Sequence, residues 1–340
     1  MSIQEELKSE FIAVIENTQS HLKNHPEWRG RYADYVTLIC ANEPLIKRVR
    51  RSFREWSPLY VYLNISSAKK AINSVSFELR YMGQTVAKLK GNKNKKHKLS
   101  TTKDLVETNR CNFECNICLS SADWDGSDAK EFRSFFKNRK GPRKDVAKGN
   151  DEHRLQSLLL TEFSKTKNKV LRNIKPVTIG GVRFPMPTQI SASNHKKPHY
   201  IEPGKSGGID ILARTGTGGK ATRLCIMELK DENTKREPPK DVMKQAIAYA
   251  TFIRELLRSD CGGNWWKLFG FVGGKVPEPL ELYAICVMRS DPDNNDYSFR
   301  DMELNIESDT IKLHYLYFDE ETNKNKIKIK PGNTTLAVIE

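Results

Sequence analysis

Two acidic residues and a lysine interrupt sequence that otherwise has the apolar character of β-strands. Asp210 lies in "GGIDILAR", and Glu228 and Lys230 lie in "TRLCIMELK". Because side chains alternate between the two faces of a strand, Glu228 and Lys230 are expected on the same face. Two carboxylates about 4 Å apart repel each other by roughly 4 kcal/mol at an effective dielectric constant near 20. Acids placed together in this way would be stabilised by a bound cation.

The segment between the two stretches predicts that Asp210 and Glu228 are neighbours. It contains "TGTGGK", whose glycines permit the positive φ angles of a hairpin turn. A hairpin centred near Gly219 places Asp210 almost opposite Glu228. Mg²⁺ takes one or two carboxylates and completes its coordination shell with water and substrate phosphate. We therefore expect a Mg²⁺ or Mn²⁺ site on Asp210 and Glu228, with Lys230 acting on water and phosphate. The alternative is an ordinary hairpin with an ion pair on its solvent face.

The elements around this hairpin predict a mixed α/β core. An amphipathic helix is expected in "NDEHRLQSLLLTEF", followed by strand candidates in "GGVRFPMPTQI", "GGIDILAR" and "TRLCIMELK". A second helix is expected in "DVMKQAIAYATFIRELL" and a further apolar strand in "ELYAICVM". The order helix, three strands, helix, strand is typical of an α/β sheet flanked by helices.

The two acidic motifs resemble a known family. "GGID" followed by "MELK" is similar to the pattern of the PD-(D/E)XK nuclease superfamily, which is an Asp, a spacer, and then an acid-x-Lys triplet in the next strand. Ile209 stands where that pattern usually has proline. The resemblance implies a restriction-endonuclease-like mixed β-sheet core flanked by helices. It also implies a Mg²⁺-dependent nuclease that hydrolyses DNA phosphodiester bonds with metal-activated water.

Two helices add residues to this resemblance. Gln245 and Tyr249, four residues apart, share the apolar face of the second helix. A Q-x-x-x-Y helix resembles the RecB-like and phage-exonuclease branches, where it lies near the metal and the DNA end. "EHRLQSLL" resembles the E-x-x-L-x-x-x-L helix of junction resolvases and exonucleases, which implies Glu152 as a third acid. Glu162 lies on roughly the same stripe and is the alternative.

The charge balance favours a polyanionic partner. The chain of 340 residues carries 57 Lys and Arg against 42 Asp and Glu, a formal charge of +15. A field of this sign attracts nucleic acid, and we expect DNA, with RNA as an alternative. Apolar runs stay short of the roughly 18 residues that span a bilayer, so we expect a cytoplasmic protein without membrane partners. The oligomeric state stays open, and a dimer is compatible with the sequence. The competing function is a catalytically silent, nuclease-like module that binds nucleic acid or protein.

A cysteine cluster precedes the expected core. Cys111, Cys115 and Cys118 have C-x₃-C-x₂-C spacing, and three thiolates hold structural Zn²⁺ if a fourth ligand completes the site. Cys40, His97 or His153 would be that ligand. Ordinary thiols and an iron–sulfur cluster are the alternatives.

Composition suggests three parts. We expect a helix-rich N-terminal domain over 1–105, a basic connector with the cysteines over 106–149, and the nuclease-like domain over 150–340. Trp265 and Trp266 lie in a Gly-rich stretch, where they would form core or stack on bases.

Overall fold

The computed structural model describes most of the chain and divides it into two compact units. It describes residues 3–53, 59–65, 75–90, 96–101, 115, 117–138, 151–164, 171, 174–192, 197–202, 207–215, 222–321 and 326–336. Unit 1 comprises Met1–Val36, Leu159–Val177 and Pro185–Glu340, and unit 2 comprises Thr37–Leu158 and Thr178–Phe184. The division differs from the ranges expected from composition, because the first 36 residues belong with the C-terminal half.

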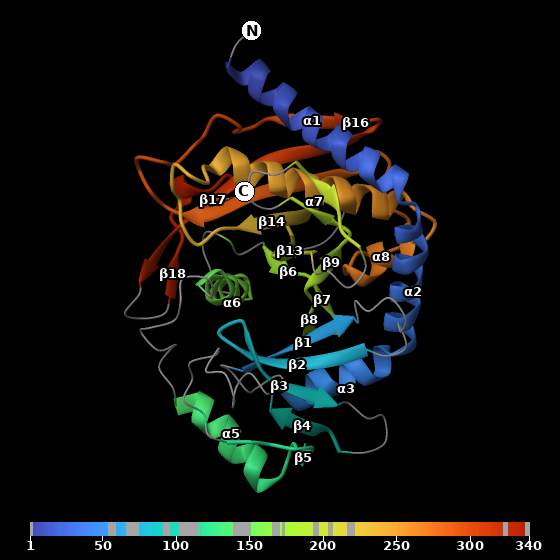
Figure 1. Cartoon of the computed structure of the whole chain (residues 1–340), viewed down its shortest axis with the longest axis vertical. Coiled ribbons are helices and arrows are strands. Elements are labelled where there is room, and N and C mark those ends of the chain that lie inside the picture. The colour runs from blue at the N-terminus through green and yellow to red at the C-terminus, as the bar shows by residue number, and fades with distance from the viewer. Residues whose placement is uncertain are drawn as a thin grey trace. The chain divides into compact units, whose positions relative to one another are not determined.

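Unit 1 is built on a mixed β-sheet, so the expected α/β class is confirmed. Its main path runs in the order β16-β17-β15-β14-β13-β6, with β18 added to β17 (Figure 1). The central strands β14, β15 and β17 are parallel, whereas β13 pairs antiparallel with β14 and β6 pairs antiparallel with β13. The strands are β6 Lys175–Pro176, β13 Ile211–Arg214, β14 Leu224–Leu229, β15 Glu281–Arg289, β16 Glu303–Ile306, β17 Asp309–Glu321 and β18 Lys326–Lys328.

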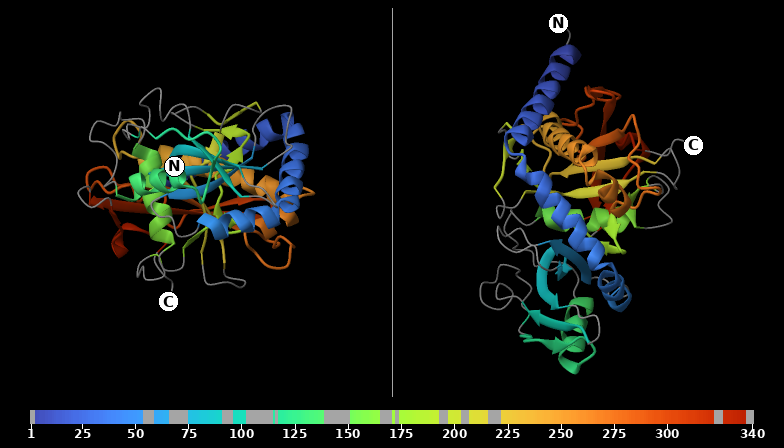
Figure 2. Two further views of the ribbon diagram at one scale, coloured as in Figure 1. Left: turned by 90° about the horizontal axis from the view of Figure 1, so that it is seen from below. Right: turned by 90° about the vertical axis from the view of Figure 1, so that its right-hand side faces the viewer.

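Helix packing on the sheet of unit 1 buries its central strands. All six residues of β14 are buried, as expected for a strand covered on both faces. Helix α7 (Pro239–Arg258) packs on β14 and β15, and α1 (Ile3–Asn24) packs along α7 (Figure 1, Figure 2). Trp265, on α8 (Gly262–Leu268), packs against Tyr32 of α2 (Glu27–Ala41). Trp265 and Trp266 are both buried, which confirms their expected core position.

Two of the expected strands of the core form differently. "GGVRFPMPTQI" contributes β8 (Val182–Arg183), β9 (Met186–Thr188) and β10 (Ile190–Ser191) to other sheets, and the short β6 takes the expected place beside β13. The prolines of this segment lack the N–H that a central strand must donate. "GGIDILAR" is divided at Asp210 into β12 (Gly207–Ile209), which pairs with β9, and β13.

Unit 2 contains a second mixed sheet. Its order is β5-β4-β3-β2-β1-β8-β7, built from β1 Leu59–Ile65, β2 Val75–Tyr81, β3 Gln84–Lys90, β4 Lys98–Thr101, β5 Ala122–Asp123, β7 Thr178–Ile179 and β8. Helices α3 (Glu43–Phe53) and α5 (Ser127–Asn138) contact β1. The expectation of a helix-rich region over 1–105 is therefore wrong beyond α3. In β2 the buried Phe77, Leu79 and Tyr81 alternate with more exposed residues, a strand period that the prediction overlooked.

The remaining elements are short, apart from one helix that belongs to both units. Strand β11 (His199–Tyr200) pairs with β10, and a 3₁₀ turn covers Pro331–Asn333. Helix α6 (Asp151–Phe163) has its first part in unit 2 and Leu159–Phe163 in unit 1. None of the helices in the described ranges combines the length and apolarity needed to cross a membrane.

A buried ion cluster ties α7 to the sheet of unit 1. Asp309, at the start of β17, is 2% exposed and accepts hydrogen bonds from Arg254 Nε and Arg258 Nε, each at 2.8 Å. It also accepts the backbone N–H of Leu280 at 2.8 Å. Burial by itself raises the pKa of Asp309, but the hydrogen bonds from Arg258, Leu280 and Arg254 outweigh it and lower that pKa. The cluster therefore needs Asp309 ionised.

We predict that Asp309→Ala destabilises the protein by about 3–5 kcal/mol, because removing one partner of a buried pair leaves the other charges uncompensated. The matched control is Glu307→Ala, since Glu307 also pairs with Arg254 but its side chain is 75% exposed. Exposed pairs contribute only about 0–1 kcal/mol. Urea unfolding of the two variants measures the difference, and equal losses would show that the cluster is not a buried anchor.

Candidate metal centre

The hairpin that carries the acids forms in the register expected from the sequence. Strand β13 pairs with β14 as Ile211↔Met227, Leu212↔Ile226, Ala213↔Cys225 and Arg214↔Leu224, which is a hairpin centred on position 219. Asp210 immediately precedes β13, and its Oδ2 accepts the backbone N–H of Leu229 at 2.9 Å. This hydrogen bond holds the Asp210 carboxylate at the end of β14, beside Glu228.

Glu228 and Lys230 lie on the same side of their strand, as the spacing of two predicts. Lys230 Nζ donates to Glu228 Oε1 at 2.8 Å. Glu228 is only 4% exposed, and the Lys230 side chain is 14% exposed. An ion pair on the solvent face of a hairpin would be far more accessible. The structure therefore excludes the alternative interpretation of this triplet as ordinary surface.

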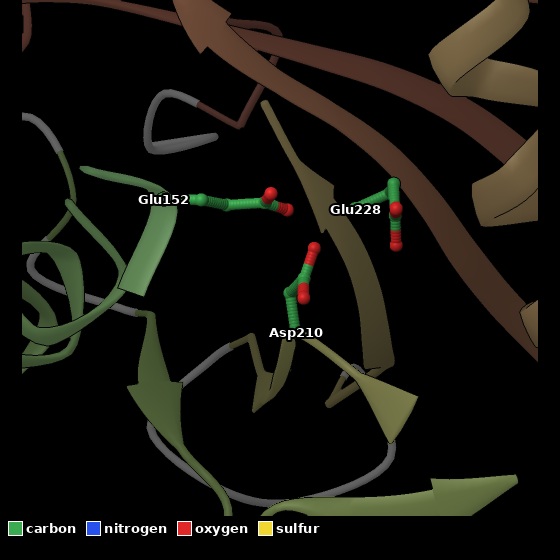
Figure 3. A group of neighbouring side chains, drawn as sticks. All are labelled: Glu152, Asp210 and Glu228. Atoms are coloured by element: carbon green, nitrogen blue, oxygen red, sulfur yellow. The ribbon is translucent and has the colours of Figure 1, made fainter. Parts of the chain in front are cut away.

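Helix α6 brings a third acid to this pair. Glu152 lies in the first turn of the helix, and one carboxylate oxygen each from Glu152, Asp210 and Glu228 lies within 4.8 Å of the other two. Figure 3 shows the Glu152 side chain extending toward the other two acids. Among the described residues, these three acids form the group of His, Cys, Asp and Glu side chains that could hold a metal ion. Glu162, the alternative third acid, does not belong to this group.

The electrostatics of the centre favour a cation. Burial raises the pKa of Asp210 well above its usual range, and the charge of Glu228 raises it further, while Lys230 and the N–H of Leu229 lower it. Among the described residues, Lys230 pairs with Glu228, and the charge of Glu228 still raises the pKa of Asp210. Carboxylate oxygens are the hard ligands that Mg²⁺ and Mn²⁺ prefer, whereas Zn²⁺ sites more often contain nitrogen or sulfur. The residues present fit a hard divalent cation.

Gln245 and Tyr249 stand one turn apart on α7, and both are buried. Gln245 Nε2 donates to Glu237 Oε1 at 3.1 Å. Burial raises the pKa of Tyr249, and the nearby Glu228 and Asp210 carboxylates raise it further, while a backbone hydrogen bond from Ala192 lowers it. Tyr249 therefore lies within electrostatic reach of the acids. Sequence reasoning missed Glu237, because nothing in the sequence indicated that it would hold Gln245.

The expected zinc site is only partly covered by the described residues. Cys111 lies outside them, Cys115 is buried and Cys118 is exposed. Cys118 Sγ accepts from Thr101 Oγ1 at 3.8 Å. Within the described ranges, Cys40, His97, His153 and the two cysteines form no group of metal ligands. The zinc site stays a prediction.

Comparison with family models, with curated proteins and with solved structures produced no match to this chain.

We predict that Asp210→Asn stabilises the metal-free protein by about 1 kcal/mol, raising its unfolding midpoint by roughly 2–4 °C. The substitution removes one of the repelling charges and keeps an acceptor for Leu229. Millimolar Mg²⁺ or Mn²⁺ should raise the midpoint of the wild-type protein, because an ion that binds only the native state stabilises it. The same ions should leave Asp210→Asn unchanged.

Thermal unfolding with EDTA, Mg²⁺ or Mn²⁺ measures both effects. The matched control is Asp260→Asn, which removes an exposed carboxylate of unit 1 outside the acidic group. A lower unfolding midpoint of metal-free Asp210→Asn would show that repulsion among the three carboxylates does not destabilise the wild-type protein.

Proposed function

We propose that the protein is a Mg²⁺-dependent nuclease that hydrolyses phosphodiester bonds of DNA and has the restriction-endonuclease-like core of the PD-(D/E)XK superfamily. The observation that carries this proposal is the meeting of Glu152, Asp210 and Glu228 within 4.8 Å, with the Lys230 ammonium bonded to Glu228. Three carboxylates this close together repel one another, which fits a site that binds a metal ion better than a structural role.

The order of elements supports the same proposal. Helix α6 precedes β6, β13 and β14, which are antiparallel neighbours, and α7 then leads to β15 parallel to β14. The acids come from the first helix and from the β13–β14 hairpin, and the Q-x-x-x-Y residues come from the second helix. Apart from β6, which takes the place of the first expected strand, this order follows the one expected from the sequence.

The side chains of the centre divide the work of the reaction. Glu152, Asp210 and Glu228 would hold the cation, which when bound supplies Lewis acidity and lowers the pKa of a coordinated water. Lys230 carries three N–H donors on a compact charge, suited to orient water and to stabilise charge that develops on a phosphate oxygen. Gln245 and Tyr249 would position substrate, since Tyr249 lies within electrostatic reach of Asp210 and Glu228 and Gln245 is one turn before it on α7.

Unit 2 offers a surface for the polyanion. One face of its sheet, here called the polar face, carries Tyr60, Tyr62, Glu78, Arg80, Lys88, Lys90, Lys98 and Arg183. Lys88 and Lys90 are exposed. Arg183 lies over the Tyr60 ring at 3.7 Å and Arg80 over the Tyr62 ring at 4.4 Å, contacts that hold the two guanidinium groups in place. Cations so arranged suit contact with phosphates.

We predict that Asp210→Ala and Glu228→Ala abolish both Mg²⁺-dependent cleavage and stabilisation by Mg²⁺. Lys230→Ala should lower the cleavage rate by at least about 10²-fold while stabilisation by Mg²⁺ is kept, because its ammonium would act on the reacting groups. The control is Lys235→Ala, which removes an exposed lysine from the segment that follows the triplet.

The assay is cleavage of labelled duplex, single-stranded and end-blocked DNA, and of RNA, with Mg²⁺ or Mn²⁺. Cleavage at the wild-type rate by Lys230→Ala would contradict the assignment of the centre. A wild-type protein that binds DNA but cuts none of these substrates would favour the alternative function, a silent binding module.

We predict separately that DNA affinity falls steeply with salt and that Lys88→Glu/Lys90→Glu lowers the slope of log K against log salt by roughly two, since each lost phosphate contact removes about one released counterion. The control is Lys326→Glu/Lys328→Glu, which makes the same charge change on exposed residues of β18. Titration in EDTA separates binding from cleavage. Equal slopes for the two variants would remove the polar face from the binding surface.

A further inference from the structure

A cavity of about 490 Å³ lies in unit 1 between α1 and the N-terminal half of α7. Figure 1 and Figure 2 show the two helices side by side. Gln245 and Asn17 line the cavity from the two helices. Its volume falls in the range of pockets that bind small organic molecules, which is about 300–1,000 Å³.

Two of the residues that line the cavity each have a buried amide oxygen without a hydrogen-bond partner among the described residues. Gln245 is 3% exposed, and its Nε2 donates to Glu237 Oε1, which fixes the amide so that Oε1 is left as an acceptor. Gln245 Oε1 and Asn17 Oδ1 are both buried atoms without a donor within the described ranges. Because more than nine in ten buried polar groups are hydrogen-bonded, two such oxygens on residues that line one cavity indicate a ligand that supplies N–H donors.

The other walls limit the kind of ligand. Ala13 and Val14 of α1, together with Ala192 and Pro198, provide apolar surface that suits the faces of a flat ring. Glu10, Glu16 and Asp241 add negative charge, against the positive charges of Lys197 and Lys244, and Lys244 is bound to Glu10 at 2.7 Å and to Asp241 at 3.3 Å. The excess of acids over lysines disfavours a phosphate. The chemistry suits an uncharged heterocycle with amino donors.

The cavity adjoins the acidic centre through two residues. Tyr249 lies one turn after Gln245 on α7, and its hydroxyl accepts a backbone hydrogen bond from Ala192, which lines the cavity. A group held in the cavity therefore lies beside the residues next to the acids.

We propose that this cavity binds a nucleobase with an exocyclic amino group, and that during cleavage it holds a base of the strand being cut. The second half of this statement rests on the proposed function, whereas binding of the base itself does not. The amino group would donate to Gln245 Oε1 and Asn17 Oδ1, and the ring would lie between the apolar walls.

The test is nucleoside binding to the full-length protein in EDTA, where no cleavage occurs, measured by calorimetry or by ligand-detected NMR. The probes are adenosine and purine riboside, which differ only by the amino group. We expect saturable binding of adenosine and about tenfold weaker binding of purine riboside. This difference corresponds to about 1.4 kcal/mol of binding free energy, because purine riboside leaves the two acceptors without a donor.

Two variants locate the site. Ala13→Trp fills the cavity from α1 and should abolish adenosine binding, whereas Ile12→Trp adds the same ring to the neighbouring residue outside it and should not. Asn17→Leu removes one acceptor and should weaken adenosine at least about fivefold. It should also keep or raise the unfolding midpoint, because the substitution removes a buried acceptor whose missing hydrogen bond destabilises the folded protein. A lower midpoint would instead assign Asn17 a structural role and contradict the proposal.

The remaining outcomes separate this inference from the proposed function. Three outcomes would overturn the nucleobase pocket even if the protein cuts DNA. They are the absence of saturable adenosine binding, equal affinity for adenosine and purine riboside, and tighter binding of N-acetylarginine amide, whose guanidinium also supplies N–H donors. Adenosine binding abolished by Ala13→Trp would support the pocket even in a protein that cuts nothing, and only the nuclease proposal would then fail.

Discussion

Repulsion among Glu152, Asp210 and Glu228 is the constraint on which the centre depends. Folding brings their oxygens within 4.8 Å in a largely buried place, where like charges interact strongly. Lys230 and the N–H of Leu229 offset only part of this cost, and the pKa of Asp210 remains raised because of burial and Glu228. The rest of the fold must supply the stability that keeps these acids together. Such local destabilisation is typical of functional sites.

The sheet and α7 of unit 1 provide that stability. Strand β14, which carries Glu228, is buried along its length and lies between β13 and β15. Helix α7 covers the two parallel strands and is fixed at its C-terminal end by the cluster of Arg254, Arg258 and Asp309. The same helix carries Tyr249, which lies within electrostatic reach of Asp210 and Glu228, so one packed element also contributes to the proposed site. Support of this kind would keep the geometry of a functional site in place.

The acids and the exposed lysines lie on different elements. Asp210 and Glu228 belong to unit 1 and Glu152 to the part of α6 that belongs to unit 2, whereas Lys88 and Lys90 are exposed on β3. The net charge of +15 favours a polyanionic partner, whereas the three carboxylates give the proposed centre the negative charge that a divalent cation needs. The proposed base pocket continues this pattern, since its acidic rim disfavours phosphate but accepts an uncharged ring.

Local patterns by themselves determined the hairpin and the side of the strand on which its charged residues lie. The turn glycines and the spacing of two between Glu228 and Lys230 predicted the register and the shared face, because a hairpin and a strand have fixed short-range periods. The spacing of four placed Gln245 and Tyr249 on one face of α7 for the same reason. Only the tertiary structure decided that α1 packs on α7, that β6 completes the sheet, that Glu237 holds Gln245 and that β1 to β4 form a sheet of another unit. These contacts join segments far apart in the chain, and they depend on how side chains of particular shape fill the core, which no local period encodes.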